Sequence, residues 1–458
     1  MPLDLWTPLR ILWQLKAAER SCRWSRIKLE QHQARRLAAL RRFAIQRSPF
    51  YRKFHSGMEN RPLTDLPILN KATMMENFDE LVTDRSVKLA DAQAYLDANG
   101  PGLFRKRYLV LCTSGSSGRR GVFLFSKAEW IAALAAIARP RLWAGLSGGL
   151  RKPGRSAMIA STTSSHYSAQ VTERFSRWMP VLRLDAAAPL ESLVEQLNGW
   201  QPEGLFGYPS VLRQLAEEQI AGRLRIQPRG LGCSAEVLTD ETRRRAQEAW
   251  GLRVFDTYGT TEYAPIATEC THGGKHLFED GAMIEVVDER GKAVPPGATG
   301  DRVLLTIFSR HTQPLIRYEL TDMVRPLAGE CPCGRNFRLI DFVEGRLEEV
   351  LYFPRRDGRP EPMAAQPLLF YSVMEILPVA GWQIIHEEQG LSVLLAGVRD
   401  ASICDSVRSS IERVLEAEGA LAPPIRVRVV EALERGATGK APLIMSRMRK
   451  KACDAIGG

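Results

Sequence analysis

The sequence predicts an α/β protein in which a mostly parallel sheet is followed by an antiparallel β-rich part and a small α+β unit. Between residues 100 and 260, short apolar runs alternate with helical patterns, as in βαβ units. From residue 276 onward, β-rich runs are separated by Gly/Pro turns such as 295–301, which favours antiparallel pairing. Beyond a charged junction at 346–359, further strands and one helix form the small unit.

Local patterns then predict the elements in chain order. Pro49 ends a basic N-terminal helix, and Asn70 or Thr73 is expected to cap a short helix within 63–81. Gly251 is expected to stop a helix that begins at Asp240. Helical spacing also predicts helices over 127–143, 191–200, 211–220 and 400–418. Apolar runs predict strands over 157–161, 204–209, 231–234, 252–258, 283–287, 302–308, 315–318, 382–386, 391–395 and 425–430.

Length and composition indicate a globular protein of more than one domain. A chain of 458 residues is too long for one ordinary core, so two or three domains are expected. No apolar run of about 18 residues predicts a transmembrane helix, and Asp4 and Arg10 make the N-terminus a poor signal peptide. The eight cysteines are too sparse for a disulfide framework, which indicates a reducing, cytoplasmic location.

The positive charge is concentrated at the N-terminus. Residues 1–53 hold thirteen Lys and Arg against three acidic residues, a net +10 of the chain's +11. Such a segment suits nucleic acid or an anionic surface, but no recognition motif accompanies it. We therefore expect an amphipathic helix with a solvated basic face and no specific nucleic-acid partner. Its apolar side is expected to consist of Leu29, Ala34, Leu37, Ala38, Leu40 and Phe43.

A glycine- and serine-rich loop lies between two apolar runs at 108–125. Glycines allow close approach of a ligand to the backbone, hydroxyls and successive N–H groups can hold an anion, and Arg119 and Arg120 suit a polyphosphate. It is not a Walker A loop, because GxxxxGK[ST] is absent. A plain hairpin turn between two strands is an equal alternative on the loop alone.

Further polar groups follow predicted strands. Glu262 comes just after the strand that ends near 258, where open α/β sheets bind ligands and where a carboxylate can hold Mg²⁺. Asp322 lies in a polar turn, where its two oxygens can accept from ribose hydroxyls. Gly345 and Arg346 follow, and Lys440 lies in a glycine-flanked loop. Each motif is weak alone, but their order is specific.

That order resembles the acyl-adenylate-forming superfamily of acyl-CoA ligases, and within it the phenylacetate–CoA ligase branch. The motifs are TSGSSG at 113–118, GCSAE at 232–236, YGTTE at 258–262, LTD at 320–322, GR at 345–346 and the late GK at 439–440. SPFYR near the start, DLPILNK at 65–71 and CPCGR at 331–335 are marks of the branch. The resemblance covers roughly residues 45–440.

The resemblance implies an enzyme that uses ATP and Mg²⁺ to convert a carboxylic acid into an acyl-adenylate, and then CoA to form a thioester. It implies an N-terminal adenylation domain, 1–346, of layered α/β sheets with a β-barrel-like subdomain, and a small mobile domain, 347–458. Phosphates would bind at 113–121, Mg²⁺ at Glu262, and the ribose at Asp322 beside Arg346. Lys440 would be the catalytic lysine and Glu348 the hinge. The implied ATP- and AMP-binding residues are Thr113, Ser114, Gly115, Ser116, Ser117, Gly118, Arg119, Ser234, Ala235, Glu236, Tyr258, Gly259, Thr260, Thr261, Asp322 and Arg346.

Departures from the family pattern leave alternatives open. Arg119 and Arg120 stand where relatives commonly have Lys and Pro, and Glu348 stands where Asp is usual. The stretch 350–370 lacks the usual glycine-rich opening of the small domain. One alternative is therefore transfer of the activated acyl group to an amine, and a second is a non-catalytic nucleotide-binding or scaffold protein. The identity of the acid and the oligomeric state, a homodimer included, stay open.

Four residues have the composition of a zinc site. Cys270 and His276, with Cys331 and Cys333, supply three thiolates and one imidazole, which make a closed tetrahedral site. The branch that the chain resembles often carries this set, so structural zinc is favoured over a chance cluster. His272 is a competing ligand. The remaining cysteines are interpreted as packing residues: Cys22, Cys112, Cys233, Cys404 and Cys453.

Aromatic residues near the predicted strand ends are candidates for the acyl pocket, although core packing is the better explanation for each one taken individually. His166 can orient a carboxylate or serve as a structural histidine. The candidates are His166, Tyr167, Phe206, Tyr208 and Tyr263.

Overall fold

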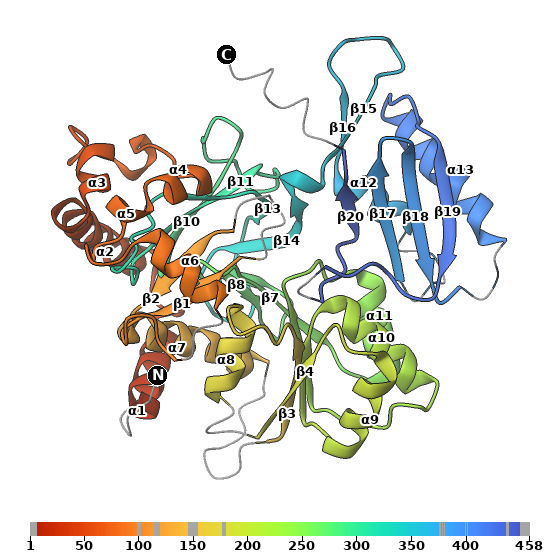
Figure 1. The fold of residues 1–458 in the computed structure, drawn as a ribbon, viewed down its shortest axis with the longest axis horizontal. Helices are drawn as coiled ribbons and strands as arrows, with labels where there is room; N and C mark the ends of the chain where they lie inside the picture. The colour runs from red at the N-terminus through yellow and green to blue at the C-terminus, as the bar shows by residue number, and fades with distance from the viewer. Residues whose placement is uncertain are drawn as a thin grey trace.

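The computed structural model shows a large N-terminal part and a smaller C-terminal part on either side of a cleft (Figure 1). It describes residues 7–98, 102–113, 120–144, 154–175, 180–374, 377, 379, 381–398, 400, 402–436 and 439–448. Within these ranges, no helix combines the length and the apolar character that crossing a membrane requires.

Short helices precede the sheets. Asn70 caps one of them, since its Oδ1 accepts a hydrogen bond from Thr73 N at 2.8 Å, which confirms one of the two predicted caps. The sequence did not predict α6. The helices are α1 (Thr7–Ser21), α2 (Arg26–Arg47), α3 (Pro49–Phe54), α4 (Lys71–Glu76), α5 (Phe78–Leu81) and α6 (Leu89–Asp97).

The basic helix α2 packs differently from the prediction. Leu29 and Leu40 are buried as expected, but Ala34 and Ala38 are exposed. Some guanidinium groups of the basic face also donate to backbone carbonyls of the large part, even though Arg36 itself is exposed. Arg36, for example, donates to Phe308 O at 3.3 Å. Helical spacing had identified an apolar stripe, but it could not show that arginines would dock the same helix.

Nine strands form the main sheet, in the order β13-β14-β9-β8-β7-β6-β5-β3-β4. The five strands from β7 to β4 are parallel to one another, and β8, β9, β14 and β13 continue the sheet in antiparallel pairing. The expected parallel α/β sheet is thus present. Its strands are β3 (Ser156–Ala160), β4 (Val181–Asp185), β5 (Gly204–Gly207), β6 (Gly230–Ser234), β7 (Val254–Tyr258), β8 (Ala267–Glu269), β9 (Lys275–Leu277), β13 (Asp322–Leu327) and β14 (Leu339–Arg346).

Helices connect the parallel strands and begin and end where local signals place them. Ser126 and Glu129 form a capping box at the start of α7, and Gly251, with a φ of 68°, ends α11 in the left-handed conformation. Leucine- and alanine-rich faces of α9, α10 and α11 bury one side of the sheet. The helices are α7 (Lys127–Trp143), α8 (Tyr167–Phe175), α9 (Leu190–Trp200), α10 (Pro209–Ile220) and α11 (Asp240–Trp250).

Smaller antiparallel sheets complete the large part. β1 (Leu109–Cys112) pairs with β2 (Val122–Phe125), so the glycine-rich segment connects two antiparallel strands. β10 (Ala282–Val287), β11 (Arg302–Ile307) and β12 (Tyr318–Leu320) form a three-stranded antiparallel sheet. The strand expected at 315–318 therefore begins only at Tyr318. Closure of this β-rich part into a barrel stays a prediction.

The C-terminal part follows the 3₁₀ turn η2 (Leu347–Glu349). Where the sequence lacks the family's glycine-rich opening, an antiparallel hairpin and a helix are present, and a four-stranded sheet follows in the order β19-β18-β17-β20. Its core is built around the fully buried Trp382. The elements are β15 (Leu351–Phe353), β16 (Met363–Ala365), α12 (Pro367–Met374), β17 (Gly381–Glu387), β18 (Gly390–Ala396), α13 (Ile403–Ala417), β19 (Ile425–Val430) and β20 (Ile444–Ser446).

Candidate active site

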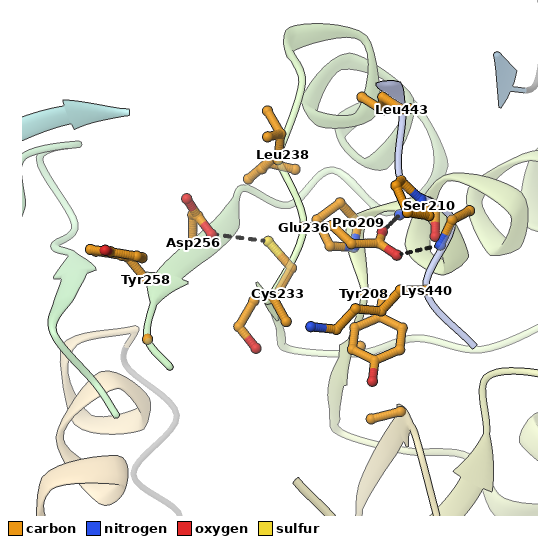
Figure 2. A pocket seen from close by; sticks show the side chains of 18 of the residues that line it. Tyr208, Pro209, Ser210, Cys233, Glu236, Leu238, Asp256, Tyr258, Lys440 and Leu443 are labelled. Atoms are coloured by element: carbon orange, nitrogen blue, oxygen red, sulfur yellow. Dashed lines mark hydrogen bonds between the residues drawn. The ribbon is translucent and has the colours of Figure 1, made fainter. Parts of the chain in front are cut away.

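A cleft of about 2370 Å³ lies between the carboxyl ends of the parallel strands and the C-terminal part, and we call it the central cleft. Residues that directly follow β3, β5, β6 and β7 line it, as expected at the ligand-binding edge of an open α/β sheet. Segments on both sides of η2 contribute, so the cleft is complete only when the two parts meet. Figure 2 shows its centre around Glu236 and Lys440.

Nearly all the described residues that the sequence predicts as site residues line this one cleft. The residues Ser114, Gly115, Ser116, Ser117, Gly118 and Arg119 lie outside the described part of the chain. Glu348 lies in η2, and its side chain is likewise not described. The residues that line the cleft are Thr113, His166, Tyr167, Phe206, Tyr208, Ser234, Ala235, Glu236, Tyr258, Gly259, Thr260, Thr261, Glu262, Asp322, Arg346 and Lys440.

Asp322 is held from both sides at the start of β13. Tyr258 Oη donates to its Oδ2 at 2.9 Å, and Arg346 Nε donates to its Oδ1 at 3.2 Å. Burial, with the nearby Asp322 carboxylate, raises the pKa of Tyr258 well above its usual value, so the phenol stays a donor. Each carboxylate oxygen keeps one further lone pair for a ligand.

Gly345 is required beside this pair. Its φ is 136°, and a Cβ there would lie 2.5 Å from Glu349 Oε2, the atom that accepts from Arg346 N. The glycine-arginine motif therefore places the Arg346 backbone against η2.

Glu262 is buried in the loop between β7 and β8. Its Oε1 accepts a hydrogen bond from Tyr318 Oη at 3.1 Å. Its Oε2 has no hydrogen-bond partner among the described residues, although it lies at the wall of the central cleft. One oxygen is therefore fixed and the other is available to a cation.

Lys440 enters the cleft from the C-terminal part. Its ammonium makes no hydrogen bond or ion pair within the described chain, and lies 5.8 Å from the centroid of the Tyr208 ring. The pKa of Lys440 is lowered to about 8, mainly by burial and also by the positive charge of Arg346, whereas Glu236 and Asp322 oppose the shift. A buried ammonium without a counter-ion in the described chain suits an anionic ligand.

Glu236 fastens the Lys440 loop to the large part, a role that the sequence did not predict. Its Oε1 accepts from Ala441 N at 2.9 Å and its Oε2 from Ser210 N at 3.0 Å (Figure 2). Burial raises the pKa of Glu236. Because Ala441 directly follows Lys440, this carboxylate fixes where the lysine enters. The partners are backbone N–H groups, which leave no trace in side-chain patterns.

The acyl-pocket candidates divide between two cavities. His166 Nδ1 lies 2.7 Å from Ser161 Oγ, and burial lowers the pKa of His166, so the ring is neutral at pH 7. Tyr208 Oη accepts from Ser161 N at 3.1 Å. Tyr263 does not line the central cleft as expected. It lines a separate cavity of about 150 Å³, because its side chain points toward Asp280 and Gly281 under α7.

The cysteines and histidine predicted as a metal site meet at one point. The Sγ atoms of Cys270, Cys331 and Cys333 and a nitrogen of His276 all lie within 4.8 Å of one another, and we call these residues the cysteine cluster. His272 is exposed and lies outside the cluster. The Sγ–Sγ distance of 3.5 Å between Cys270 and Cys331 is far too long for a disulfide.

This geometry fits a tetrahedral metal ion. With Zn–S bonds of about 2.3 Å, neighbouring sulfurs of a tetrahedron lie about 3.8 Å apart. Phe337 O lies 3.3 Å from His276 Nδ1, so Nε2 faces the thiols, at 3.3 Å from Cys333 Sγ. The donor set and its orientation are those of a closed structural site.

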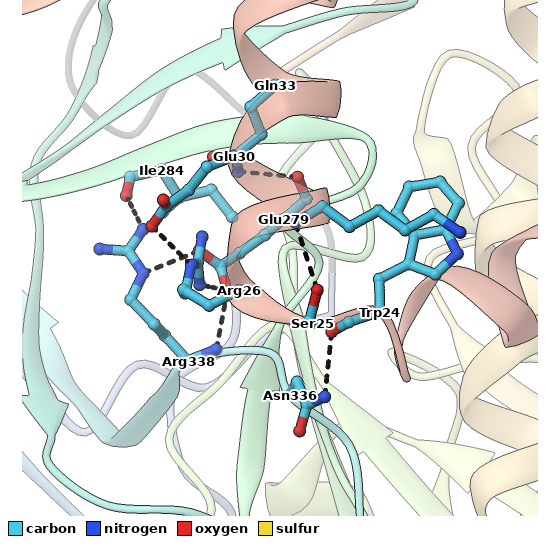
Figure 3. Close-up of polar contacts among 10 residues, drawn as sticks. Trp24, Ser25, Arg26, Glu30, Gln33, Glu279, Ile284, Asn336 and Arg338 are labelled. Carbon is cyan, nitrogen blue, oxygen red and sulfur yellow. Dashed lines mark hydrogen bonds and ion pairs between the residues drawn. The ribbon is translucent and has the colours of Figure 1, made fainter.

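A buried polar network next to the cluster holds helix α2 (Figure 3). The Glu279 carboxylate accepts from Arg26 Nη1 at 2.9 Å and from Arg338 N at 2.7 Å and Nε at 2.8 Å. Gln33 Nε2 donates to Glu279 O at 2.9 Å, and Asn336 Nδ2 donates to Trp24 O at 3.0 Å. The N-terminal helices are thus attached directly to the segment that carries the cysteines.

Comparisons with known proteins agree with this architecture. Residues 110–305 match the family described as AMP-binding enzyme. The chain is 24% identical to a phenylacetate-coenzyme A ligase of Thermus thermophilus over 383 residues, 80% of each chain. It is 29% identical to one of Pseudomonas putida over 199 residues, 41% of this chain but only 44% of that relative.

The fold is similar to that of a 2-hydroxyisobutyryl-CoA ligase in its postadenylation state. The TM-score is 0.66 at 19% identity, and the match covers 86% of this chain and 84% of that one. With the same ligase in its thioesterification state, the TM-score is 0.55. In sequence the chain is thus similar to AMP-binding enzymes and phenylacetate-coenzyme A ligases, and in fold it is similar to an adenylate-forming CoA ligase.

Proposed function

We propose that this enzyme activates a carboxylic acid with ATP to an acyl-adenylate and then transfers the acyl group to CoA. The observation that supports this most is the position of Lys440. It reaches from the C-terminal part into the cleft that also contains Asp322 and Glu262, and it has no partner of its own among the described residues. Three segments far apart in sequence thus offer two anionic groups and a cation to one ligand.

The residues suit the parts of ATP. Asp322 would accept from the ribose hydroxyls with its remaining lone pairs, and the Tyr258 ring would lie near the base. Thr113, at the end of β1, would begin the phosphate-binding loop, where its Oγ1 already accepts from Gly121 N at 2.8 Å. The available oxygen of Glu262 would hold Mg²⁺, which neutralises phosphate charge when bound.

In the first step, a carboxylate oxygen of the acid attacks the α-phosphorus, and the bond to the bridging oxygen of the β-phosphate breaks to release pyrophosphate. Negative charge builds up on the non-bridging oxygens during this step. The Lys440 ammonium would stabilise that charge, and a preorganised group of this kind contributes about 10²–10³-fold in rate. In the second step, the CoA thiolate attacks the acyl carbonyl and AMP leaves.

We propose further that the cysteine cluster holds a structural zinc ion. Cys270, Cys331, Cys333 and His276 Nε2 would supply all four ligands, so the ion would have no open position for chemistry. It would join the loop after β8 to the loop between β13 and β14. Thiolate ligands agree with the reducing cytoplasm that the cysteine content suggests.

The test is carboxylate-dependent exchange of pyrophosphate into ATP, with a panel of aryl and alkyl acids. Lys440→Ala is expected to lower this exchange by about 10²–10³-fold, and replacement of the exposed Lys292 by alanine is the matched control. ATP binding without exchange for any acid would instead favour the scaffold alternative. Mass spectrometry of products, with CoA and amines offered separately, identifies the acceptor. An amide without a thioester would overturn the CoA step alone.

A further inference from the structure

Two arginines on α7 lie two residues apart but differ in their partners. Arg139 is buried and paired, since its Nη1 and Nη2 donate to the Asp280 carboxylate at 3.1 and 2.7 Å. Arg141 lies on another face of the helix and lines the central cleft. Among the described residues, its Nη1 and Nη2 donate to Ser156 Oγ alone, at 3.3 and 3.2 Å, and its guanidinium lies 5.0 Å from the centroid of the Phe206 ring.

No carboxylate neutralises Arg141. Among the described residues it forms no ion pair. The sequence contains no Asp or Glu between Glu129 and Glu173, so the undescribed residues 145–153 contribute none. Burial lowers the pKa of Arg141, and no acidic neighbour offsets this effect. A partly buried cation without a counter-ion is unfavourable, which leaves a binding opportunity for an anion.

Two of the other arginines along the cleft provide a contrast, whereas Arg435 donates to Gly439 O at 2.6 Å and to Gln214 Oε1 at 2.8 Å. Arg346 is paired with Asp322, and Arg243 is paired with Glu269. Sequence reasoning missed Arg141, because one cation near the end of an alanine-rich helix also suits the helix dipole. The contacts of Arg141 with Ser156 and Phe206, which the sequence could not predict, show that its side chain faces the cleft.

Arg141 lies at the far end of a slot along one face of the sheet. On this face Met158 of β3, Phe206 of β5 and Phe255 of β7 are half-buried, whereas the alternate residues of the same strands are buried against α9, α10 and α11. Gly232 of β6 lets the Phe206 ring lie directly against the sheet, since a Cβ there would lie 2.6 Å from Phe206 Cδ1. The slot therefore has apolar walls.

The two ends of this slot differ in chemistry. Ser156, the partner of Arg141, begins β3, and Ser161, the partner of His166, follows its end. Five strand residues span about 16 Å. The positive charge of Lys440 is close enough to His166 to lower the pKa of that histidine, so the reacting centre lies at the His166 end.

We propose that the acid activated by this enzyme is a dicarboxylate with an apolar spacer, and that Arg141 and Ser156 bind the carboxylate remote from the one that is adenylated. This inference rests on the proposed adenylation. The planar guanidinium can bind a carboxylate in a bidentate manner while keeping its contact with Phe206. The ligand anion thereby supplies the counter-charge that the chain does not.

The experiment compares acids that differ only in the remote group. The pairs are α,ω-dicarboxylates and monocarboxylates of equal chain length, and 1,4-phenylenediacetate with 4-methylphenylacetate. For wild type, kcat/KM in pyrophosphate exchange is expected to be about 100-fold or more higher for the diacid of the best pair. Arg141→Met is expected to remove or reverse this preference, and Arg141→Lys to restore part of it. Replacement of the exposed Arg183 by glutamine is the matched control.

A binding measurement separates this inference from the adenylation proposal. Calorimetry without ATP is expected to show diacid binding that Arg141→Met abolishes and Arg183→Gln preserves. If monoacids are activated as well as diacids, or Arg141→Met leaves the ratio unchanged, the inference fails and adenylation stands. If no acid supports exchange but the diacid still binds through Arg141, adenylation fails and the anion site stands. A fall in thermal stability with an unchanged ratio would assign Arg141 a structural role only.

Discussion

The cysteine cluster and the central cleft both collect polar groups from distant segments, but they use them in opposite ways. Around the cluster, the groups are directed at one another: His276 is oriented by Phe337 O, and both oxygens of Glu279 are bound by arginines. In the cleft, the ammonium of Lys440 and one oxygen of Glu262 lack partners among the described residues. Around the cluster, the chain supplies partners for its own polar groups and orients the four residues proposed to hold zinc, whereas in the cleft two charged groups are left for ligands by the described chain.

The largest effect is expected from removing the proposed zinc ion from the cysteine cluster. Cys331→Ser is expected to abolish zinc binding and to lower the melting temperature sharply, since structural zinc contributes about 10–16 kcal/mol in zinc-finger peptides at pH 7. That is comparable with the whole stability of a domain, about 5–15 kcal/mol. Metal analysis of purified protein and thermal unfolding provide the measurements.

Cys404→Ser, in α13 and away from the cluster, is the matched control and is expected to keep both metal and stability. Purified wild-type protein without metal, together with a Cys331→Ser variant of unchanged melting temperature, would contradict the zinc proposal.

A smaller effect is expected from weakening the contact by which Glu236 holds the Lys440 loop in the central cleft. In Glu236→Gln, an amide NH₂ would face one of the two backbone N–H groups of Ser210 and Ala441. Loss of a hydrogen bond to a charged group costs about 1.5–3 kcal/mol, so single-turnover adenylate formation is expected to slow by about 10- to 100-fold. Thioester formation from a preformed acyl-adenylate is expected to change less, since the resemblance implies that the small domain rotates for that step.

Replacement of the exposed Glu388 by glutamine is the control for charge. Equal slowing of both half-reactions would show that Glu236 does not act through this contact.

The smallest effect concerns pH. Because the pKa of Lys440 is lowered to about 8, kcat/KM for ATP is expected to decline as pH rises through about 8 and the ammonium loses its proton. Bound phosphates favour the charged form, so kcat is expected to decline at a higher pH. The pH profiles of both parameters provide the measurement, and a flat kcat/KM profile up to pH 10 would contradict it.

As pH rises and kcat/KM declines, the contribution of Lys440 to the free energy of unfolding is expected to increase. Unfolded lysine titrates near pH 10.4, so between about pH 8 and 10.4 the unfolded state binds more protons than the folded state. The contribution of Lys440 to the free energy of unfolding therefore rises with pH in this window. Lys440→Met should remove that rise, which urea unfolding at several pH values would show.

The sequence predicted best what depends on neighbours in the chain. The helices α7 and α11 begin at Ser126 and Thr239 caps and need no distant contact to be recognised. The sequence was a poorer guide to contacts between side chains that are far apart in the chain. The docking of α2 by Arg36, the position of Tyr263 in a second cavity and the hydrogen bonds of Glu236 all depend on tertiary contacts.

The site shows the same division. The ordered motifs predicted which residues share a cleft, because motif order reflects the family rather than the geometry. They did not predict Arg141, since no motif contains it and its significance lies in the absence of a nearby carboxylate.

Helix α7 has a consequence for redesign of the acid specificity. Its Trp143 packs edge-on against His276, with ring centroids 5.6 Å apart, and donates to Glu19 Oε1 at 2.9 Å, while Arg141, less than one turn earlier, lies at the far end of the slot. A redesign that moved this helix to admit a bulkier acid would therefore also disturb the cysteine cluster. Reshaping the floor at Phe206 and Gly232 would change substrate choice while leaving that scaffold intact.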